Sequence, residues 1–151
     1  MDKSTQAASR LLAFRFLSTS QLLYRSLELM MGRELGLSVR QWRVMFFLAN
    51  DGVGSVQEIA DFCRYDKSQV SRALQELTDK AYVNRVPSAH DRRKVLASLT
   101  PAGIEVYRQG LRISLARDER MKRALSADEL AAFNATLDKL AEQAQAIMDE
   151  L

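Results

Sequence analysis

Apolar residues recur at helical spacing between residues 56 and 77, in two short runs separated by a polar turn. The first run predicts a helix that buries Val56, Ile59, Ala60 and Cys63, and the second predicts one that buries Val70, Ala73, Leu74 and Leu77. Each run opens on a capping box, Ser55-Val-Gln-Glu58 and Asp66-Lys-Ser-Gln69, which satisfies free amides at a helix start. Two capped helices joined by so short a turn predict a helix-turn-helix.

Two segments typical of strands follow this pair of helices, residues 82–86 and 94–99, and the charged residues 87–93 separate them. Strand, charged loop and strand together predict a wing. We therefore expect a mainly α fold with a small β wing, a winged helix-turn-helix flanked by long N- and C-terminal helices.

Helical patterns flank this module on both sides. The first runs from Thr5 to about Met31, where Gly32 and Gly36 are expected to end it. Ser38-Val-Arg-Gln41 opens a second helix that stops at Asn50-Asp-Gly52, Thr100-Pro101 opens a third, and Ser126-Ala-Asp-Glu129 opens the last. We expect one domain over residues 1–151, with the winged helix-turn-helix at about 37–100 and dimerisation helices at 5–34 and 101–151.

The last helix has the clearest periodicity in the chain. Its apolar residues step alternately by three and four positions and form a heptad seam: Leu130, Phe133, Leu137, Leu140, Ala144, Ile147 and Leu151. Packing within one chain would satisfy such a seam. A helix at the chain end has few neighbours, however, so we favour its burial in a homodimer.

Composition fits a soluble globular protein, with 47% hydrophobic and 27% charged residues in a chain of 151. No apolar run approaches the ~20 residues of a membrane-spanning helix. The N-terminal sequence lacks the apolar core of a signal peptide, and the single cysteine excludes an intramolecular disulfide. These features predict a cytoplasmic protein with no membrane partner.

Charge is distributed unevenly. Residues 63–95 hold eight Lys or Arg against four Asp or Glu, whereas residues 124–151 hold one Lys against six acids. A basic centre favours a polyanionic partner. An ordinary mixed solvated surface is the alternative.

Catalytic and metal chemistry find little support. His90 is the only histidine and has no recognisable set of further ligands, and neither a nucleophile–base pairing nor a Gly-rich phosphate loop is present. We predict no enzyme, no metal and no cofactor.

Cys63 falls on the buried face of its helix and is expected to be a small core residue, with redox sensing as the less favoured alternative.

One motif resembles a known family. Asp91-x-Arg93, five residues, Leu99-Thr100, two residues and Gly103 are similar to the wing signature of the MarR transcription regulators, and Trp42-Arg-Val-Met45 follows a helix start as in that family. The resemblance implies a winged helix-turn-helix dimer whose N- and C-terminal helices interlock. The family's peroxide-sensing branch carries its reactive cysteine in the first helix, where this chain has none.

A DNA-reading role assigns parts to the basic and polar residues. The helix that begins at Asp66 or Lys67 would enter the major groove, where Gln69 suits adenine and Arg72 suits guanine. Ser68 and Ser71 suit phosphates or adaptable base contacts, or merely solvate the helix start; Arg64 and Lys67 suit phosphates. In the wing, Arg92 and Arg93 are the candidates for the minor groove, and Lys94 is a further predicted DNA-binding residue. The resemblance assigns the insertion chiefly to Arg93, with Asp91 holding its guanidinium.

The resemblance also implies a small aromatic or anionic effector, bound in a crevice beside the reading module. The residues that would border such a crevice are Arg15, Tyr24, Trp42 and Arg43, although core packing is the favoured explanation for each of them taken singly. The predicted function is a ligand-responsive repressor, a homodimer on a pseudo-palindromic DNA operator. An activator of the same architecture and a winged-helix protein that binds only other proteins are the alternatives.

Overall fold

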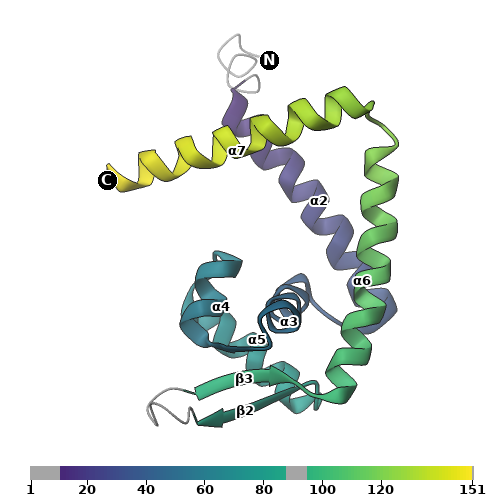
Figure 1. Ribbon diagram of the computed structural model, residues 1–151, viewed down its shortest axis with the longest axis vertical. Helices are drawn as coiled ribbons and strands as arrows, with labels where there is room; N and C mark the ends of the chain where they lie inside the picture. Colours follow the sequence, from purple (N-terminus) through teal and green to yellow (C-terminus); the bar gives the residue numbers. More distant parts are fainter. Residues whose placement is uncertain (1–10, 88–94, 151) are drawn as a thin grey trace, which may run out of the picture. The chain divides into compact units, whose positions relative to one another are not determined.

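The computed structural model describes residues 11–87 and 95–150. The chain divides into two compact units, residues 1–111 and 112–151. The first unit holds α2 (Leu12–Leu35), α3 (Val39–Asp51), β1 (Val53–Ser55), α4 (Val56–Cys63), α5 (Lys67–Asp79), β2 (Val83–Pro87), β3 (Val95–Leu99) and the first half of α6 (Pro101–Lys122) (Figure 1). The second unit holds the rest of α6 and α7 (Ala127–Asp149). The predicted fold class, mainly α with a small β wing, is confirmed.

All four predicted capping boxes form. The cap side chains of Ser38, Ser55, Asp66 and Ser126 accept a hydrogen bond from the amide three residues later, and the Gln or Glu at that position accepts one from the cap amide. Two amides at each of these four helix starts are thereby satisfied by local sequence alone.

The end of α2 differs from the expectation. The helix continues through Gly32 to Leu35, and Gly36, at φ 63°, ends it in the left-handed conformation. A glycine within a helix weakens it without stopping it, whereas a left-handed C-cap favours glycine strongly. Gly36 is therefore the terminator, and the expectation that Gly32 also ends the helix was wrong.

The sheet contains a third strand that the sequence pattern did not predict. β1 pairs antiparallel with β3, and β3 pairs with β2, giving the order β1-β3-β2. Gly54 lies opposite Ala97, and Arg85 lies opposite the same residue from the other side. β1 has three residues, too few for alternation to show. It follows α3 closely and ends at Ser55, which is the cap of α4.

The core lies between α3, α4, α5 and the sheet. Ile59, Ala60 and Cys63 of α4 are buried, as are all four apolar residues predicted for α5. Val56 is an exception, because it is only half-buried at the first turn of α4.

Helix α7 buries none of its residues. Leu130, Leu137 and Leu140 are half-buried, while Phe133 and Ile147 are 51% and 52% exposed. Leu151 lies outside the described residues. Among residues 11–87 and 95–150, no helix has the length and apolar content needed to cross a membrane.

Candidate nucleic-acid interface

Helix α5 presents one apolar and one polar face. Val70, Ala73, Leu74 and Leu77 are buried, whereas Lys67, Ser68 and Arg72 are exposed, and Gln69 and Ser71 are half-buried. The predicted reading residues on this helix therefore share its outer side. The capping box at Asp66 sets the residue at which the helix begins.

The start of α5 is a closed hydrogen-bond unit. The hydroxyl of Ser68 donates 2.5 Å to Oδ1 of Asp66, and the amide of Gln69 donates 2.8 Å to the same oxygen. The Ser68 hydroxyl, followed by the Gln69 amide, lowers the pKa of the Asp66 carboxyl, because both bonds favour its charged form. Asp66 is therefore held ionised at the positive end of the helix dipole.

Gln69 takes part in the same unit, which bears on its expected role. Its Oε1 accepts a 3.3 Å hydrogen bond from the amide of Asp66. A bidentate contact to adenine needs both the oxygen and the NH2 group of the side chain. Gln69 would have to give up the reciprocal half of the capping box to make one.

Arg72 lies one turn further along the exposed face. Its Nε donates a 3.4 Å hydrogen bond to the carbonyl oxygen of Ser68, so the side chain is drawn back toward the start of the helix. The first turn of α5 enters a major groove in helix-turn-helix proteins. This arrangement directs the guanidinium to the part of the helix that would meet base edges.

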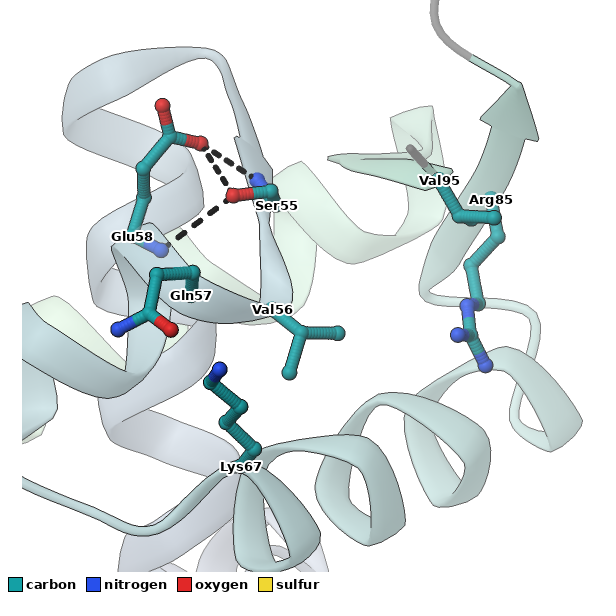
Figure 2. A pocket seen from close by; sticks show the side chains of 7 residues that line it. All are labelled: Ser55, Val56, Gln57, Glu58, Lys67, Arg85 and Val95. Carbon is teal, nitrogen blue, oxygen red and sulfur yellow. Dashed lines mark hydrogen bonds between the residues drawn. The ribbon is translucent and has the colours of Figure 1, made fainter. Parts of the chain in front are cut away.

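A groove of about 540 Å³ lies beside this face, between the starts of α4 and α5 and the strands of the wing. It is lined by Ser55, Val56, Gln57, Glu58, Lys67, Arg85 and Val95 (Figure 2). Lys67 and Arg85 lie on either side of Val56, and the Glu58 carboxylate is turned onto the amide and hydroxyl of Ser55, at 2.8 and 2.7 Å. The groove thus offers two cations from different elements to an anion.

Arg85 is a groove residue that the sequence did not single out. It belongs to the basic segment, but the sequence favoured the wing loop over the strand before it. The cross-strand register that brings β2 close to α4 and α5 cannot be seen without the fold. Gln57, which also lines the groove, gave no signal at all.

Arg64 lies in the turn between α4 and α5. It closes α4 in the left-handed conformation, at φ 51° and ψ 46°, a region that a non-glycine residue adopts at some cost. Its side chain is exposed, at the same end of α5 as Lys67. Asp91, Arg92, Arg93 and Lys94, the predicted wing residues, lie outside the described residues.

The four predicted effector residues fall into different surroundings. Trp42 is only 5% exposed, stacks on Tyr107 at 5.5 Å between ring centroids, and lies so close to Gly110 that no Cβ would fit there. It is part of the core. Arg15 is exposed on α2, more than two helical turns before Tyr24.

Tyr24 and Arg43, in contrast, share an electrostatic neighbourhood with Tyr65, a residue that the sequence did not single out. The guanidinium of Arg43 lies over the Tyr65 ring, 5.0 Å from its centroid. Burial raises the pKa of the Tyr24 hydroxyl, and Tyr65 and Glu28 raise it further while Arg40 and Arg43 oppose them. The Tyr65 hydroxyl is buried and has no hydrogen-bond partner among the described residues.

Comparison with known proteins finds a similarity to one family. The sequence model of the MarR family matches residues 35–94, which run from the end of α2 through β2 and stop just before β3. The multiple antibiotic resistance protein MarR of Salmonella typhimurium is 27% identical over 107 residues, or 70% of this chain and 74% of that protein, and MarR of Salmonella typhi gives the same figures. The chain is similar to the MarR family.

Several solved structures have the same fold as this chain. A cysteine-to-serine mutant of E. coli MarR, complexed with operator DNA, gives a TM-score of 0.81 at 23% identity and covers 93% of this chain and 99% of its own. A MarR/EmrR family regulator from Acinetobacter sp. ADP1 gives 0.81 at 21% identity, with coverages of 97% and 99%. BpsR of Bordetella bronchiseptica, whose DNA binding is regulated by 6-hydroxynicotinic acid, gives 0.78 at 20% identity, with coverages of 88% and 94%.

Proposed function

We propose that this chain is a MarR-family transcription regulator that binds a specific DNA operator through α5 and the groove beside it. The observation that carries the proposal is the pairing of an exposed reading face with two groove cations, Lys67 and Arg85, supplied by α5 and β2. A phosphate backbone passing along the groove would meet both cations while α5 lies in the adjacent major groove. The similarity in fold to the operator-bound MarR mutant supports this arrangement.

In this proposal the contacts divide into two classes. Arg72 reads guanine, and Gln69 reads adenine with its NH2 group or after leaving the cap. Arg64, Lys67, Ser68, Ser71 and Arg85 meet phosphates, and in the wing Arg93, held by Asp91, enters the minor groove beside Arg92 and Lys94. Phosphate contacts position the module, and base contacts give it sequence preference.

We further propose that the working unit is a homodimer on a pseudo-palindromic operator. Apolar side chains remain exposed along α2 and α7, including Phe14, Leu17, Leu22, Phe133 and Ile147. Exposed apolar residues at this density indicate a surface that is covered in the working protein. Two copies related by a two-fold axis would present two recognition helices to two half-sites.

The proposed mode of action is repression in the cytoplasm that a small aromatic or anionic effector relieves. The regulation of BpsR by 6-hydroxynicotinic acid is a precedent within the same fold. Tyr24, Arg43 and Tyr65 are the residues to which we assign the effector, with Arg15 as a more distant candidate and Trp42 as structural support. An effector acts by binding more tightly to the form of the dimer in which the two recognition helices are wrongly spaced for DNA.

Selection of DNA from a random library, followed by titration of the selected fragment, tests the proposal. Wild-type protein should enrich an inverted repeat and bind it at least ~10³-fold more tightly than unrelated DNA. Lys67→Ala and Arg85→Ala should each reduce the slope of log affinity against log salt by roughly one unit. Lys139→Ala, a charge change on α7, is the matched control and should leave the slope unchanged.

The same experiment separates the rival functions. A winged-helix protein that binds only other proteins would enrich no sequence and show equal, weak affinity for all DNA. An activator would enrich an operator as a repressor does. Transcription from a promoter that carries the selected operator, with and without the protein, distinguishes those two.

A further inference from the structure

Helix α5 is fastened to the helices behind it at two points, one turn apart. Oε2 of Glu76 accepts a 2.7 Å hydrogen bond from Nε2 of Gln41 on α3, and Nζ of Lys80 donates a 2.5 Å hydrogen bond to the carbonyl oxygen of Gly36 at the end of α2. These bonds join residues 35 and 44 positions apart in the sequence. We call Gln41, Glu76, Lys80 and the Gly36 carbonyl the clasp.

Gln41 is the most constrained member of the clasp. It is 6% exposed, the one buried polar or charged side chain among the described residues. Its Oε1 accepts a 3.0 Å hydrogen bond from the amide of Ser38, while its NH2 group reaches Glu76. One buried amide group therefore caps α3 and holds α5, and it satisfies both its acceptor and its donor by doing so.

The same end of α3 is tied to α2. Oε2 of Glu28, on α2, accepts a 2.7 Å hydrogen bond from the amide of Val39, the first residue of α3. The start of α3 thus contacts α2 through Glu28 and α5 through Gln41. A change in the direction of α2 must be followed by α3 or must break this bond.

Lys80 links the end of α5 to the end of α2. Gly36 is the C-cap of α2, where the unpaired carbonyls give the helix end a negative partial charge. Lys80 is itself the C-cap of α5. Because its ammonium group donates to the Gly36 carbonyl oxygen, it holds the ends of α2 and α5 together. Its hydrogen bond is assisted by charge, which makes it stronger than one between neutral groups.

We propose that Glu76 and Lys80 are positioning residues for DNA binding, because the clasp fixes the orientation of α5 against α2 and α3. The apolar face of α5 supplies most of its packing, but apolar contact is not directional and leaves a helix free to roll. Two directional bonds one turn apart oppose that roll. The inference rests on the proposed function, and it makes α2 the element whose movement the reading face of α5 follows.

Three substitutions in the full-length protein test the clasp. Lys80→Met keeps the aliphatic stem and removes the donor, and Glu76→Met removes the acceptor. Glu76→Gln removes the charge but keeps an acceptor oxygen for Gln41, so it is the conservative control. Each variant is titrated at several salt concentrations against the fragment selected by wild-type protein, and its backbone amide exchange is measured without DNA.

Lys80→Met and Glu76→Met should each lower operator affinity by about tenfold, the factor that corresponds to about 1.4 kcal/mol. The salt slope should stay at the wild-type value, because neither residue neutralises a phosphate. Glu76→Gln should restore most of the affinity that Glu76→Met loses. Amides at residues 33–37 and 77–82 should exchange faster together in Lys80→Met.

Unchanged operator affinity in Lys80→Met would overturn the inference. A salt slope lower by about one unit would overturn it too, since Lys80 would then be a direct phosphate contact. If wild-type protein selects no operator, the proposed function fails instead. The amide exchange of Lys80→Met then tests whether the clasp holds the two helix ends. Exchange equal to that of wild type at residues 33–37 and 77–82 would refute it.

Discussion

The hydroxyl of Thr100 donates a 2.8 Å hydrogen bond to the carbonyl oxygen of Ala81, in the turn that follows α5. The same hydroxyl accepts a 3.0 Å bond from the amide of Gly103, and the Thr100 amide donates 3.0 Å to the carbonyl oxygen of Tyr82. Thr100 therefore caps α6 and fastens its start to the end of the helix-turn-helix. The spacing Leu99-Thr100-x-x-Gly103 of the wing signature has this physical basis.

Gly103 lies at the same junction, where the structure leaves no room for a side chain. A Cβ atom there would overlap the carbonyl group of Tyr82. Because that group belongs to the backbone, it cannot move aside as the end of a flexible side chain could. Gly103→Ala should lower the free energy of unfolding by about 1–3 kcal/mol, as overpacking does. Gly32→Ala is the control, because nothing lies within 4 Å of its Cβ position, and within a helix it should stabilise by about 0.5–1 kcal/mol. Urea unfolding of both variants measures the difference, and equal effects would contradict the account.

The cap of α5 should give the protein a specific dependence on pH. Hydrogen bonds from Ser68 and Gln69 lower the pKa of Asp66 below its ordinary value of 3.8. The stabilisation is therefore present above that value and is lost as the pH falls through the lower pKa of the folded protein. Asp66→Ser keeps a capping oxygen that does not titrate. Melting temperatures of wild type and Asp66→Ser should converge on acidification, and a difference that is constant with pH would refute this role.

Cys63 should behave as a core residue. Its side chain is fully buried, and burial raises the pKa of its thiol, with Arg43 opposing that rise. Iodoacetamide should alkylate it only after denaturant is added, and Cys63→Ala should cost about 1 kcal/mol of stability. If peroxide releases the wild-type protein from DNA but spares Cys63→Ala, the structural role is wrong.

The seam on α7 should be where two chains meet. Leu137→Glu with Leu140→Glu would place two charges in an apolar contact, at a cost of roughly several kcal/mol. Sedimentation velocity should then show monomer where wild-type protein shows dimer. Lys139→Glu introduces a similar charge on the exposed side of the same helix and should leave the dimer intact. A folded wild-type monomer at micromolar concentration would remove the basis for the homodimer.

Local signals in the sequence predicted local structure well. Each capping box joins residues three positions apart, so Ser38, Ser55, Asp66 and Ser126 could be recognised without any knowledge of the fold. The buried face of α5 followed from helical spacing in the same way. The left-handed end of α2 was harder to predict, because Gly32 and Gly36 both suit that conformation. In the structure Gly36 adopts it, and the amide of the next residue, Leu37, donates a hydrogen bond to the carbonyl oxygen of Met31.

Contacts between distant segments could not be predicted. Gln41 was recognisable as half of a capping box, but its second bond, to Glu76, depends on how α3 crosses α5. Arg85 and Lys67 line one groove only because β2 pairs with β3 beside α4 and α5. Sequence assigned Gln69 both to the capping box and to base reading. The structure shows the conflict between these roles, because the Asp66 amide donates to the same Oε1 that a bidentate contact with adenine would need.

The most direct test of the central claim, that the exposed face of α5 reads base pairs, compares wild-type protein with Arg72→Ala. Both are titrated against the selected operator and against every single base-pair variant of one half-site. Arg72→Ala should lose roughly 1–3 kcal/mol of binding per half-site and lose its preference at one base pair, while preferences elsewhere persist. If both proteins show the same preference at every position, Arg72 reads no base and the account of DNA recognition by α5 is contradicted.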